Sequence, residues 1–196
     1  MSAPYQNDLD AAWQHAWQEL ARGCADQRHG FHLAQLASVN TEGAPDLRAV
    51  ILRATEADTK TLRMHTDARS AKCAQLAADD RAALLVYDAR SKLQLRIRGR
   101  ISLHGDDATA EAAWQAAQPM SRICYRIEPG PGSTLTAPDG YLHPEPDAGA
   151  PDPGRAHFRA LLLRAESLEW LYLAAEGHRR ARWQQNDGWR GGWLAP

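Results

Sequence analysis

The sequence predicts a mainly β protein in which an antiparallel β-barrel, closed or nearly closed, carries peripheral helices on its outside. About seven or eight short runs have the apolar or alternating composition of strands, and turn-forming residues join most of them as hairpins. Three stretches have helical periodicity. Strands this short and this often paired indicate a barrel, and no motif of a dinucleotide-binding fold or a P-loop is present. The length of 196 residues fits one domain, residues 1–196.

The composition argues against several classes of function. A formal net charge of -1 is unlike that of a protein that binds nucleic acid by neutralising phosphates. The cysteines Cys24, Cys73 and Cys124 are odd in number and widely spaced, and the histidines form no metal-binding motif. We therefore expect neither a disulfide framework nor a metal site. The polar, acidic N-terminus and the lack of a long apolar run predict a cytoplasmic protein that does not enter a membrane.

The N-terminal segment, residues 1–24, is predicted to consist mainly of one amphipathic helix. Apolar side chains recur at helical spacing from Asp8 to Arg22, and Gly23 is a plausible C-terminal stop. A strand over Phe31–Val39 follows, and the turn-forming residues 40–45 end it.

The stretch from Asp46 to Lys72 carries the strongest functional signal in the sequence. It predicts two strands, Asp46–Arg53 and Thr61–Thr66, joined by a turn and followed by a helix with Asp67 or Ser70 as its cap. Free backbone N–H groups at a helix start favour an anion. Two arginines, a lysine, a threonine and a serine gather around this helix start, which indicates a phosphate cradle beside an apolar wall. An ordinary amphipathic hairpin with solvated arginines is the alternative.

The remainder of the chain is predicted to contain further strands, one helix and one long loop. Gly99 interrupts a strictly alternating strand, which suggests a bulge or a close backbone approach. Residues 129–156, rich in proline and glycine, form a loop that is a substrate lid, a dimer arm or a disordered insertion. The predicted boundaries are a helix end near Asp80, strands over Arg81–Tyr87 and Lys92–Leu103, a helix over Asp106–Gln118 capped by Asp106 or Asp107, two strands within His157–Leu173 broken near Glu166–Ser167, and a closing hairpin of Arg179–Gln185 and Trp189–Leu194 around Asn186–Gly188.

The order and spacing of these motifs resemble the pyridoxine (pyridoxamine) 5′-phosphate oxidase-like proteins, which are FMN-binding split β-barrels that act as homodimers. The segments that carry the resemblance are ASVNTEGAPDLRAVILR, LRMHTDARSAK, RAALLVYD, LQLRIRGRISL and NDGWRGGWLAP. The resemblance implies FMN as cofactor, a small-molecule substrate, and a homodimer in which residues 157–196 supply the dimerisation strands. The tryptophans Trp13 and Trp17 share a helix face that fits packing on the body or on a partner subunit.

The resemblance also implies a set of cofactor contacts. Arg48 and Lys72 would meet the FMN phosphate, and Gln94 would lie near the ring edge. Spacing from Trp170 favours Arg180 as the C-terminal arginine of the site, whereas counting back from the C-terminus favours Arg179. The full set is Arg48, Ala49, Val50, Ile51, Leu52, Arg53, His65, Thr66, Ser70, Lys72, Gln94, Trp170 and Arg180.

One feature of this set conflicts with a flat strand. Arg48 and Arg53 have opposite parity, so a bulge, a strong twist or a ligand that spans the strand end is needed for both to touch FMN.

The sequence departs from the family where the oxidase holds its substrate. Arg53 replaces a lysine, Ala71 replaces an arginine, and the residues expected to bind the substrate phosphate fall near Trp114, Gln118 and Arg122. The sequence therefore predicts an FMN-dependent oxidoreductase whose substrate is open, with Arg53 as a possible flavin-tuning or substrate contact. The alternatives are a non-catalytic flavin- or haem-binding sensor or carrier, and a protein that uses a deazaflavin.

Overall fold

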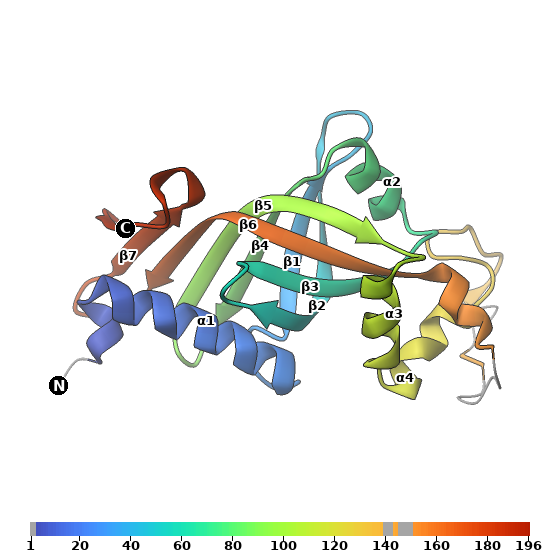
Figure 1. Cartoon of the computed structure of the whole chain (residues 1–196), viewed down its shortest axis with the longest axis horizontal. Helices are drawn as coiled ribbons and strands as arrows, with labels where there is room; N and C mark the ends of the chain where they lie inside the picture. The colour runs from blue at the N-terminus through green and yellow to red at the C-terminus, as the bar shows by residue number, and fades with distance from the viewer. Residues whose placement is uncertain (1–2, 139–142, 145–150) are drawn as a thin grey trace.

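Six strands close into an antiparallel barrel, as the sequence predicts (Figure 1). The structure is a computed structural model that describes residues 3–138, 143–144 and 151–196. The barrel strands follow the order β3-β2-β1-β4-β5-β6, and β6 pairs back onto β3. Two further strands, β7 and β8, extend the sheet beyond β6. The strands are β1 Leu33–Val39, β2 Pro45–Glu56, β3 Thr61–Asp67, β4 Arg81–Asp88, β5 Leu93–His104, β6 Phe158–Tyr172, β7 Arg179–Gln184 and β8 Gly191–Leu194.

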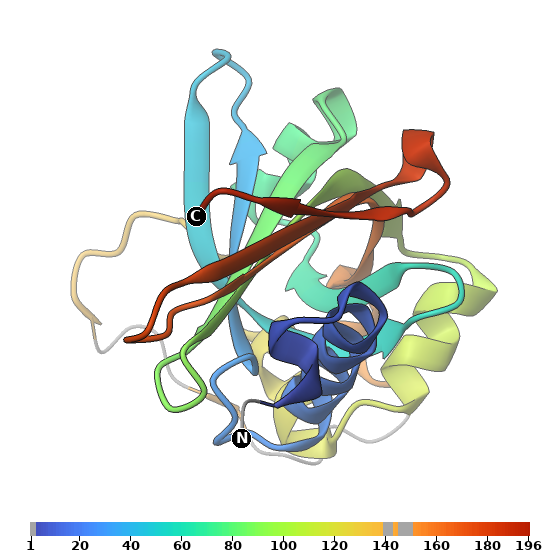
Figure 2. The same cartoon turned by 90° about the vertical axis from the view of Figure 1, so that its left-hand side faces the viewer.

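The helices lie outside the barrel (Figures 1 and 2). α1 crosses one side, α2 sits at one end, and α3 and α4 lie side by side near the start of β6. Predicted helix ends differ from the structure by a few residues, since α2 stops before Asp80 and α3 stops before Gln118. The α-helices are α1 Leu9–Ala25, α2 Ala71–Ala78, α3 Ala108–Gln115 and α4 Pro119–Arg122.

The sequence analysis placed the end of the first helix incorrectly. α1 continues through Gly23 to Ala25, so Gly23 is not a stop. A β-carbon at Gly23 would lie 2.8 Å from the β-carbon of Phe31, which is fully buried. The glycine therefore lets the end of α1 approach the chain before β1 closely.

The predicted break at Glu166–Ser167 is also wrong, because β6 is one continuous strand with a bulge. Arg98 pairs with Ser167 and Gly99 pairs with Ala165, which leaves Glu166 as the extra residue. A β-carbon on Gly99 would overlap the carbonyl oxygen of Arg164, so the close backbone approach predicted at Gly99 is confirmed. The bulge bends β6 at the point where its partner changes from β3 to β7.

A second bulge lies in β2 and bears on the parity of the two arginines. Leu52 pairs with Met64 and Ala54 pairs with Arg63, so Arg53 is the unpaired residue between them. Of the alternatives that the sequence analysis named, a bulge is therefore present. The side chains of Arg48 and Arg53 nevertheless lie on different sides of the barrel wall.

The C-terminal hairpin differs slightly from the prediction. β7 ends at Gln184, a single turn of 3-10 helix spans Gln185–Asp187, and β8 starts only at Gly191. Trp189 lies in the connection with a positive φ of 61° instead of beginning the strand.

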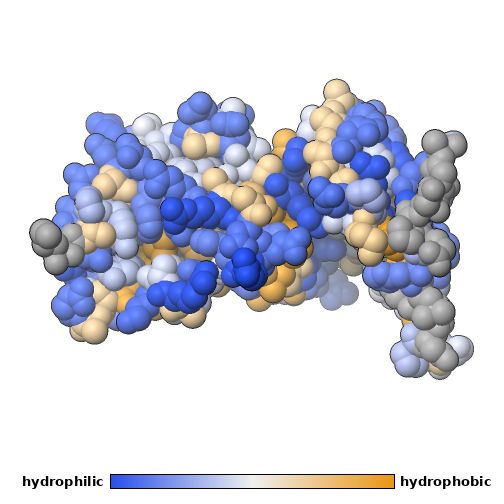
Figure 3. Space-filling model, turned by 90° about the horizontal axis from the view of Figure 1, so that it is seen from below, coloured by the Kyte–Doolittle hydropathy of each residue, from blue (hydrophilic) through white to orange (hydrophobic). Residues whose placement is uncertain are grey.

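Two hydrophobic clusters fill the molecule. The main one occupies the barrel and the side covered by α1, and a smaller one around Trp114, Tyr125 and Phe158 joins α3 to the start of β6. On the face seen from below, hydrophobic residues form small patches separated by hydrophilic ones (Figure 3). No described helix is both long and apolar enough to cross a bilayer. Residues 139–142 and 145–150 of the predicted loop 129–156 lie outside the described residues, and the lid or arm interpretation stays a prediction.

Candidate functional site

Lys72, Thr66 and Ser70 form a hydrogen-bonded cluster where β3 meets α2. Lys72 Nζ lies 3.1 Å from both Thr66 Oγ1 and Ser70 Oγ, and the two hydroxyl oxygens are 3.1 Å apart. Ser70 Oγ donates its proton to the backbone carbonyl of Asp67 at 2.7 Å, so it accepts from Lys72. Ser70 stands at the N-cap position of α2 without capping the helix through its side chain. Thr66 and Ser70 are buried, and we call these three residues the cradle.

Burial lowers the pKa of Lys72, and the nearby charge of Arg48 lowers it further. In the described part of the chain Lys72 makes no ion pair with a carboxylate. Its two hydrogen bonds go to hydroxyl groups. An ammonium group in this setting gains from an added anion, which would restore the pKa that burial reduces. The cradle therefore has the donors that a phosphate group needs.

Arg48 lies beside the cradle in a second polar network. Its guanidinium donates to Ser38 Oγ at 2.6 Å, to Gln75 Oε1 at 2.7 Å and to Asp46 Oδ2 at 2.6 Å. Gln75 also donates to Asp46 Oδ2 at 2.8 Å, and this bond together with Arg48 lowers the pKa of Asp46. Ser38, Gln75 and Asp46 thus fix Arg48 at the end of the barrel next to α2.

His65 and Arg53 lie on the other side of the barrel wall from the cradle. Strand alternation places Thr66 inward and His65 outward, where its ring packs edge-on against Phe158 at a centroid distance of 4.8 Å. Burial, with Arg53 and Arg63 nearby, lowers the pKa of His65 to about 3, so the imidazole is neutral at physiological pH. Arg53 Nε, Arg63 Nε and His65 Nε2 are buried without a hydrogen-bond partner within the described chain.

The predicted flavin wall over residues 49–52 alternates between the two sides of the barrel. Val50 and Leu52 are buried in the core, whereas Ala49 is exposed and Ile51 is half-buried on the outer face. A ligand on the outer face would therefore meet the side chains of Ala49 and Ile51 and only the backbone of the other two.

Gln94 and Arg180 lie away from the cradle on the outer face of β5 to β7. Both pair with Leu171, on opposite sides of β6. Arg180 donates to Glu169 at 2.6 Å, and Arg96 binds the same carboxylate at 2.8 Å. Arg179 instead donates to the carbonyl of Gly177 at 2.7 Å.

Trp170 points into the core and is fully buried. Its ring contacts Tyr5, Tyr172 and Trp193, so it does not reach the surface of the chain near the cradle. The structure therefore brings Arg48, Thr66, Ser70 and Lys72 together, and it keeps Gln94, Trp170 and Arg180 apart from them.

Sequence reasoning missed three polar residues of this region. Gln75 follows Lys72 by three residues on α2 and so shares its helix face, a spacing that sequence alone shows. Ser38 joins through β1, and Arg69 binds Asp67 beneath the cradle, which only the folded chain reveals. In the described part of the chain no group of histidine, cysteine or acidic side chains has the arrangement of a metal site.

A family model and a related protein together show the relationship of the chain to known proteins. Residues 10–105 match the model described as pyridoxamine 5′-phosphate oxidase, FMN-binding domain. An Arabidopsis thaliana protein, pyridoxine/pyridoxamine 5′-phosphate oxidase 2, is 30% identical over 80% of this chain and 83% of its own length. The chain belongs to the pyridoxamine 5′-phosphate oxidase family. The pyridoxine/pyridoxamine 5′-phosphate oxidase of Anaeromyxobacter dehalogenans is 33% identical, but this match covers 53% of this chain and 51% of that enzyme.

A solved structure agrees with the fold. The pyridoxamine 5′-phosphate oxidase-related, FMN binding protein of Nostoc punctiforme superposes with a TM-score of 0.74 at 24% sequence identity, with full coverage of both chains. This likeness confirms the split barrel with peripheral helices as the fold of this family member.

Proposed function

We propose that the protein binds FMN with its phosphate in the cradle and acts as an oxidoreductase on a small molecule. The observation that carries the proposal is the half-buried Lys72, which bonds only to two hydroxyl groups in the described structure and has Arg48 beside it. Two cations and two hydroxyls match the charge and the acceptor oxygens of a terminal phosphate. A deazaflavin fits this donor set less well, because the set is suited to the terminal phosphate of FMN.

Different residues of the chain would bind different parts of the cofactor. Lys72, Thr66 and Ser70 would bind the phosphate, and Arg48 would add positive charge at the same end of the barrel. Arg53 lies beyond the wall on the outer side, where a guanidinium favours negative charge on a flavin ring. FMN supplies the hydride chemistry when bound, and the protein supplies orientation and electrostatics.

The site is proposed to be composite, formed by two copies of the chain. Gln94 and Arg180 share the outer sheet face, yet they lie apart from the cradle of their own chain. A homodimer that places this face against a second copy would bring Arg180 to the partner's cofactor, as the resemblance implies, and we propose the same for Gln94. The resemblance places the family's substrate-phosphate residues near Trp114 and Arg122, which in this chain form a cation–π pair at 4.9 Å.

The first experiment is a visible absorbance titration of the purified protein with FMN. A resolved flavin spectrum is expected, and Lys72→Ala should weaken FMN binding by about tenfold or more, the loss expected for charge-assisted hydrogen bonds. Lys92→Ala is the matched control, because Lys92 lies exposed in the turn between β4 and β5. A wild-type protein that takes up no FMN, or a Lys72→Ala variant that binds it normally, would contradict the proposal.

A second measurement separates an enzyme from a carrier. Bound flavin in an oxidoreductase is reduced by NAD(P)H or an organic substrate and is reoxidised by oxygen or another acceptor. Bound flavin that undergoes neither reaction would favour the non-catalytic sensor or carrier. Stopped-flow absorbance near the flavin band follows both half-reactions.

A further inference from the structure

We propose that Arg69 is a positioning residue that sets the geometry of the cradle from beneath it. This inference rests on the proposed binding of FMN phosphate by Lys72, Thr66 and Ser70. Arg69 itself does not touch the cradle, and it would act through Asp67 and the turn between β3 and α2.

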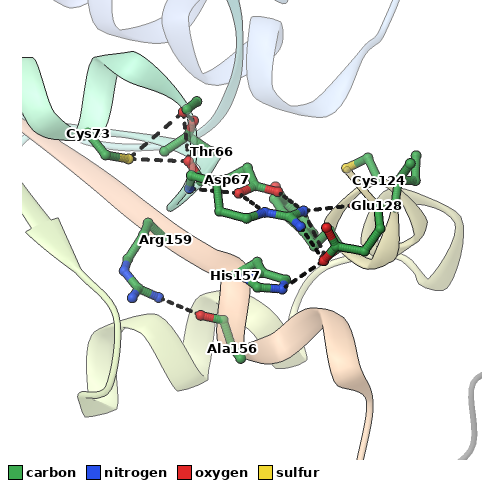
Figure 4. A network of polar contacts seen from close by, with 12 residues as sticks. Thr66, Asp67, Cys73, Cys124, Glu128, Ala156, His157 and Arg159 are labelled. Carbon is green, nitrogen blue, oxygen red and sulfur yellow. Dashed lines mark hydrogen bonds and ion pairs between the residues drawn. The ribbon is translucent and has the colours of Figure 1, made fainter. Parts of the chain in front are cut away.

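Arg69 joins separate segments of the chain through one guanidinium group. Nε and Nη2 donate to the two carboxylate oxygens of Asp67 at 2.9 and 2.7 Å. Nη1 donates to Glu128 at 2.6 Å, and Nη2 also reaches the carbonyl of Ile127 at 3.1 Å. Figure 4 shows Asp67, Glu128 and His157 near one another. His157 Nε2 lies 3.6 Å from Glu128 Oε1. All three nitrogens of the guanidinium are thus engaged.

The bonds of Asp67 carry this constraint to the cradle. Its carboxylate is bound by Arg69, while its backbone carbonyl accepts from Ser70 Oγ at 2.7 Å and from Cys73 Sγ at 3.3 Å (Figure 4). Ser70 Oγ is the same atom that accepts from Lys72 at 3.1 Å. Because Ser70 uses its one proton on Asp67, its lone pairs face the ammonium group, and a shift of Asp67 would redirect them.

The neighbouring backbone adds to the constraint. Ala68 N–H donates to the carbonyl of His157 at 2.7 Å, which ties the turn to the start of β6. Asp67 is 7% exposed, so its pairing with Arg69 is shielded from competing water. The turn is therefore held on one side by β6 and on the other by residues 127 and 128.

The same short motif occurs elsewhere in the chain without these links. Arg81 binds Asp79 two residues earlier through its backbone N–H at 3.1 Å and its Nε at 2.9 Å, as Arg69 binds Asp67. In the described structure the side-chain hydrogen bonds of Arg81 all go to Asp79, and the side chain is 67% exposed. Arg81 therefore supplies a matched control that removes one arginine from the same local motif.

The test compares the affinity of the full-length chain for FMN and for riboflavin, which lacks the phosphate. In Arg69→Gln, the ratio of the riboflavin Kd to the FMN Kd should fall by about tenfold, because only phosphate binding depends on the cradle. Arg81→Gln should leave the ratio unchanged. A loss of stability alone would not change the preference for a phosphate, so the ratio separates positioning from a general structural role.

A milder variant keeps the proposal testable if Arg69→Gln does not fold. Glu128→Gln removes the negative charge that pairs with Arg69 at an exposed side chain, which weakens this link, and it should lower the ratio in the same direction by a smaller factor. An unchanged ratio in the variants that fold, with a wild type that prefers FMN, would overturn the role of Arg69 alone. A wild type without any preference for FMN would overturn the phosphate cradle and the role of Arg69 together.

Discussion

At the scale of single residues, the direction of each side chain decides which candidate site residues lie in the cradle and which lie outside the barrel. Thr66 and His65 are neighbours in sequence, yet Thr66 joins the cradle and His65 packs on Phe158 outside the barrel. The bulge at Arg53 places that arginine near His65. The side chains of these two adjacent residues therefore have different surroundings, because successive side chains alternate between the two faces of β3.

The buried imidazole of His65 predicts a specific pH dependence of stability. Burial, Arg53 and Arg63 lower its folded-state pKa to about 3, from the ordinary histidine value of 6.5. Between those two values the unfolded chain binds a proton that the folded chain does not, so stability falls as pH decreases from 6.5. The free energy of unfolding should therefore drop between pH 7.5 and pH 5 by up to about 2 kcal/mol more in wild type than in His65→Gln.

Denaturant unfolding without added flavin, at both pH values, measures this difference. His178→Gln, which removes an exposed imidazole in the connection after β6, is the control variant. Equal pH dependence in wild type and His65→Gln would mean that the imidazole is solvated in the folded protein.

Residue pattern alone did not single out Arg69. An aspartate precedes an arginine by two residues at Asp26, Asp46, Asp67, Asp79 and Asp88. In the four pairs other than Asp46–Arg48, the backbone N–H of the arginine donates to the aspartate. Only the folded chain shows that one of these local motifs is buried and bonded to a distant segment. The sequence did supply the cradle residues, because their spacing around a helix start is a local property.

At the scale of elements, the start of α3 decides between two caps that the sequence left open. Asp107 accepts the backbone N–H of Ala110 at 2.8 Å and also contacts His104 Nδ1 at 2.8 Å. Asp107→Ala should therefore lower the free energy of unfolding, whereas Asp106→Ala should have little effect. The two variants remove the same charge one residue apart, so thermal or denaturant unfolding isolates the cap.

The contribution of this cap should also depend on pH. The Ala110 N–H and His104 lower the pKa of Asp107, so its stabilising effect is present above the unfolded value and is lost as pH falls through the folded one. Equal stability of the two alanine variants at neutral pH would show that the cap contributes nothing.

Most strands were predictable because their patterns are local, whereas several boundaries depend on distant contacts. The alternation of β5 identified the strand, but the continuity of β6 at Glu166 depends on its pairing with β5. Gly23 has the composition of a helix stop, and its real role follows from contact with Phe31. Closure of the barrel through β3 and β6 joins strands almost a hundred residues apart, which no local pattern encodes.

At the scale of the whole molecule, one face of the sheet carries three exposed apolar side chains. Leu33 on β1, Leu47 on β2 and Tyr87 on β4 are 49%, 65% and 42% exposed. Register places them on the same face as Gln94 and Arg180. Exposed apolar residues on the same face as Gln94 and Arg180, which lie apart from the cradle of their own chain, fit an interface between two copies of the chain.

A homodimer with this interface predicts that assembly and cofactor binding are linked. Wild type should sediment at twice the 21.7-kDa chain mass, and Leu47→Glu should shift it toward the monomer, because a charge would be buried without a partner. FMN affinity should fall with dimer content, since the monomer lacks the partner's contacts. Met120→Glu, at a side chain 67% exposed on α4, should alter neither property.

Analytical ultracentrifugation across a concentration series, with and without FMN, measures both parts of this prediction. If the site is composite, FMN should lower the dimer dissociation constant of wild type, because a ligand that binds only the dimer favours the dimer. A wild-type monomer that binds FMN tightly would show that one chain holds the cofactor alone. A dimer whose dissociation constant is indifferent to FMN would separate assembly from the site and leave Gln94 and Arg180 without a role in cofactor binding.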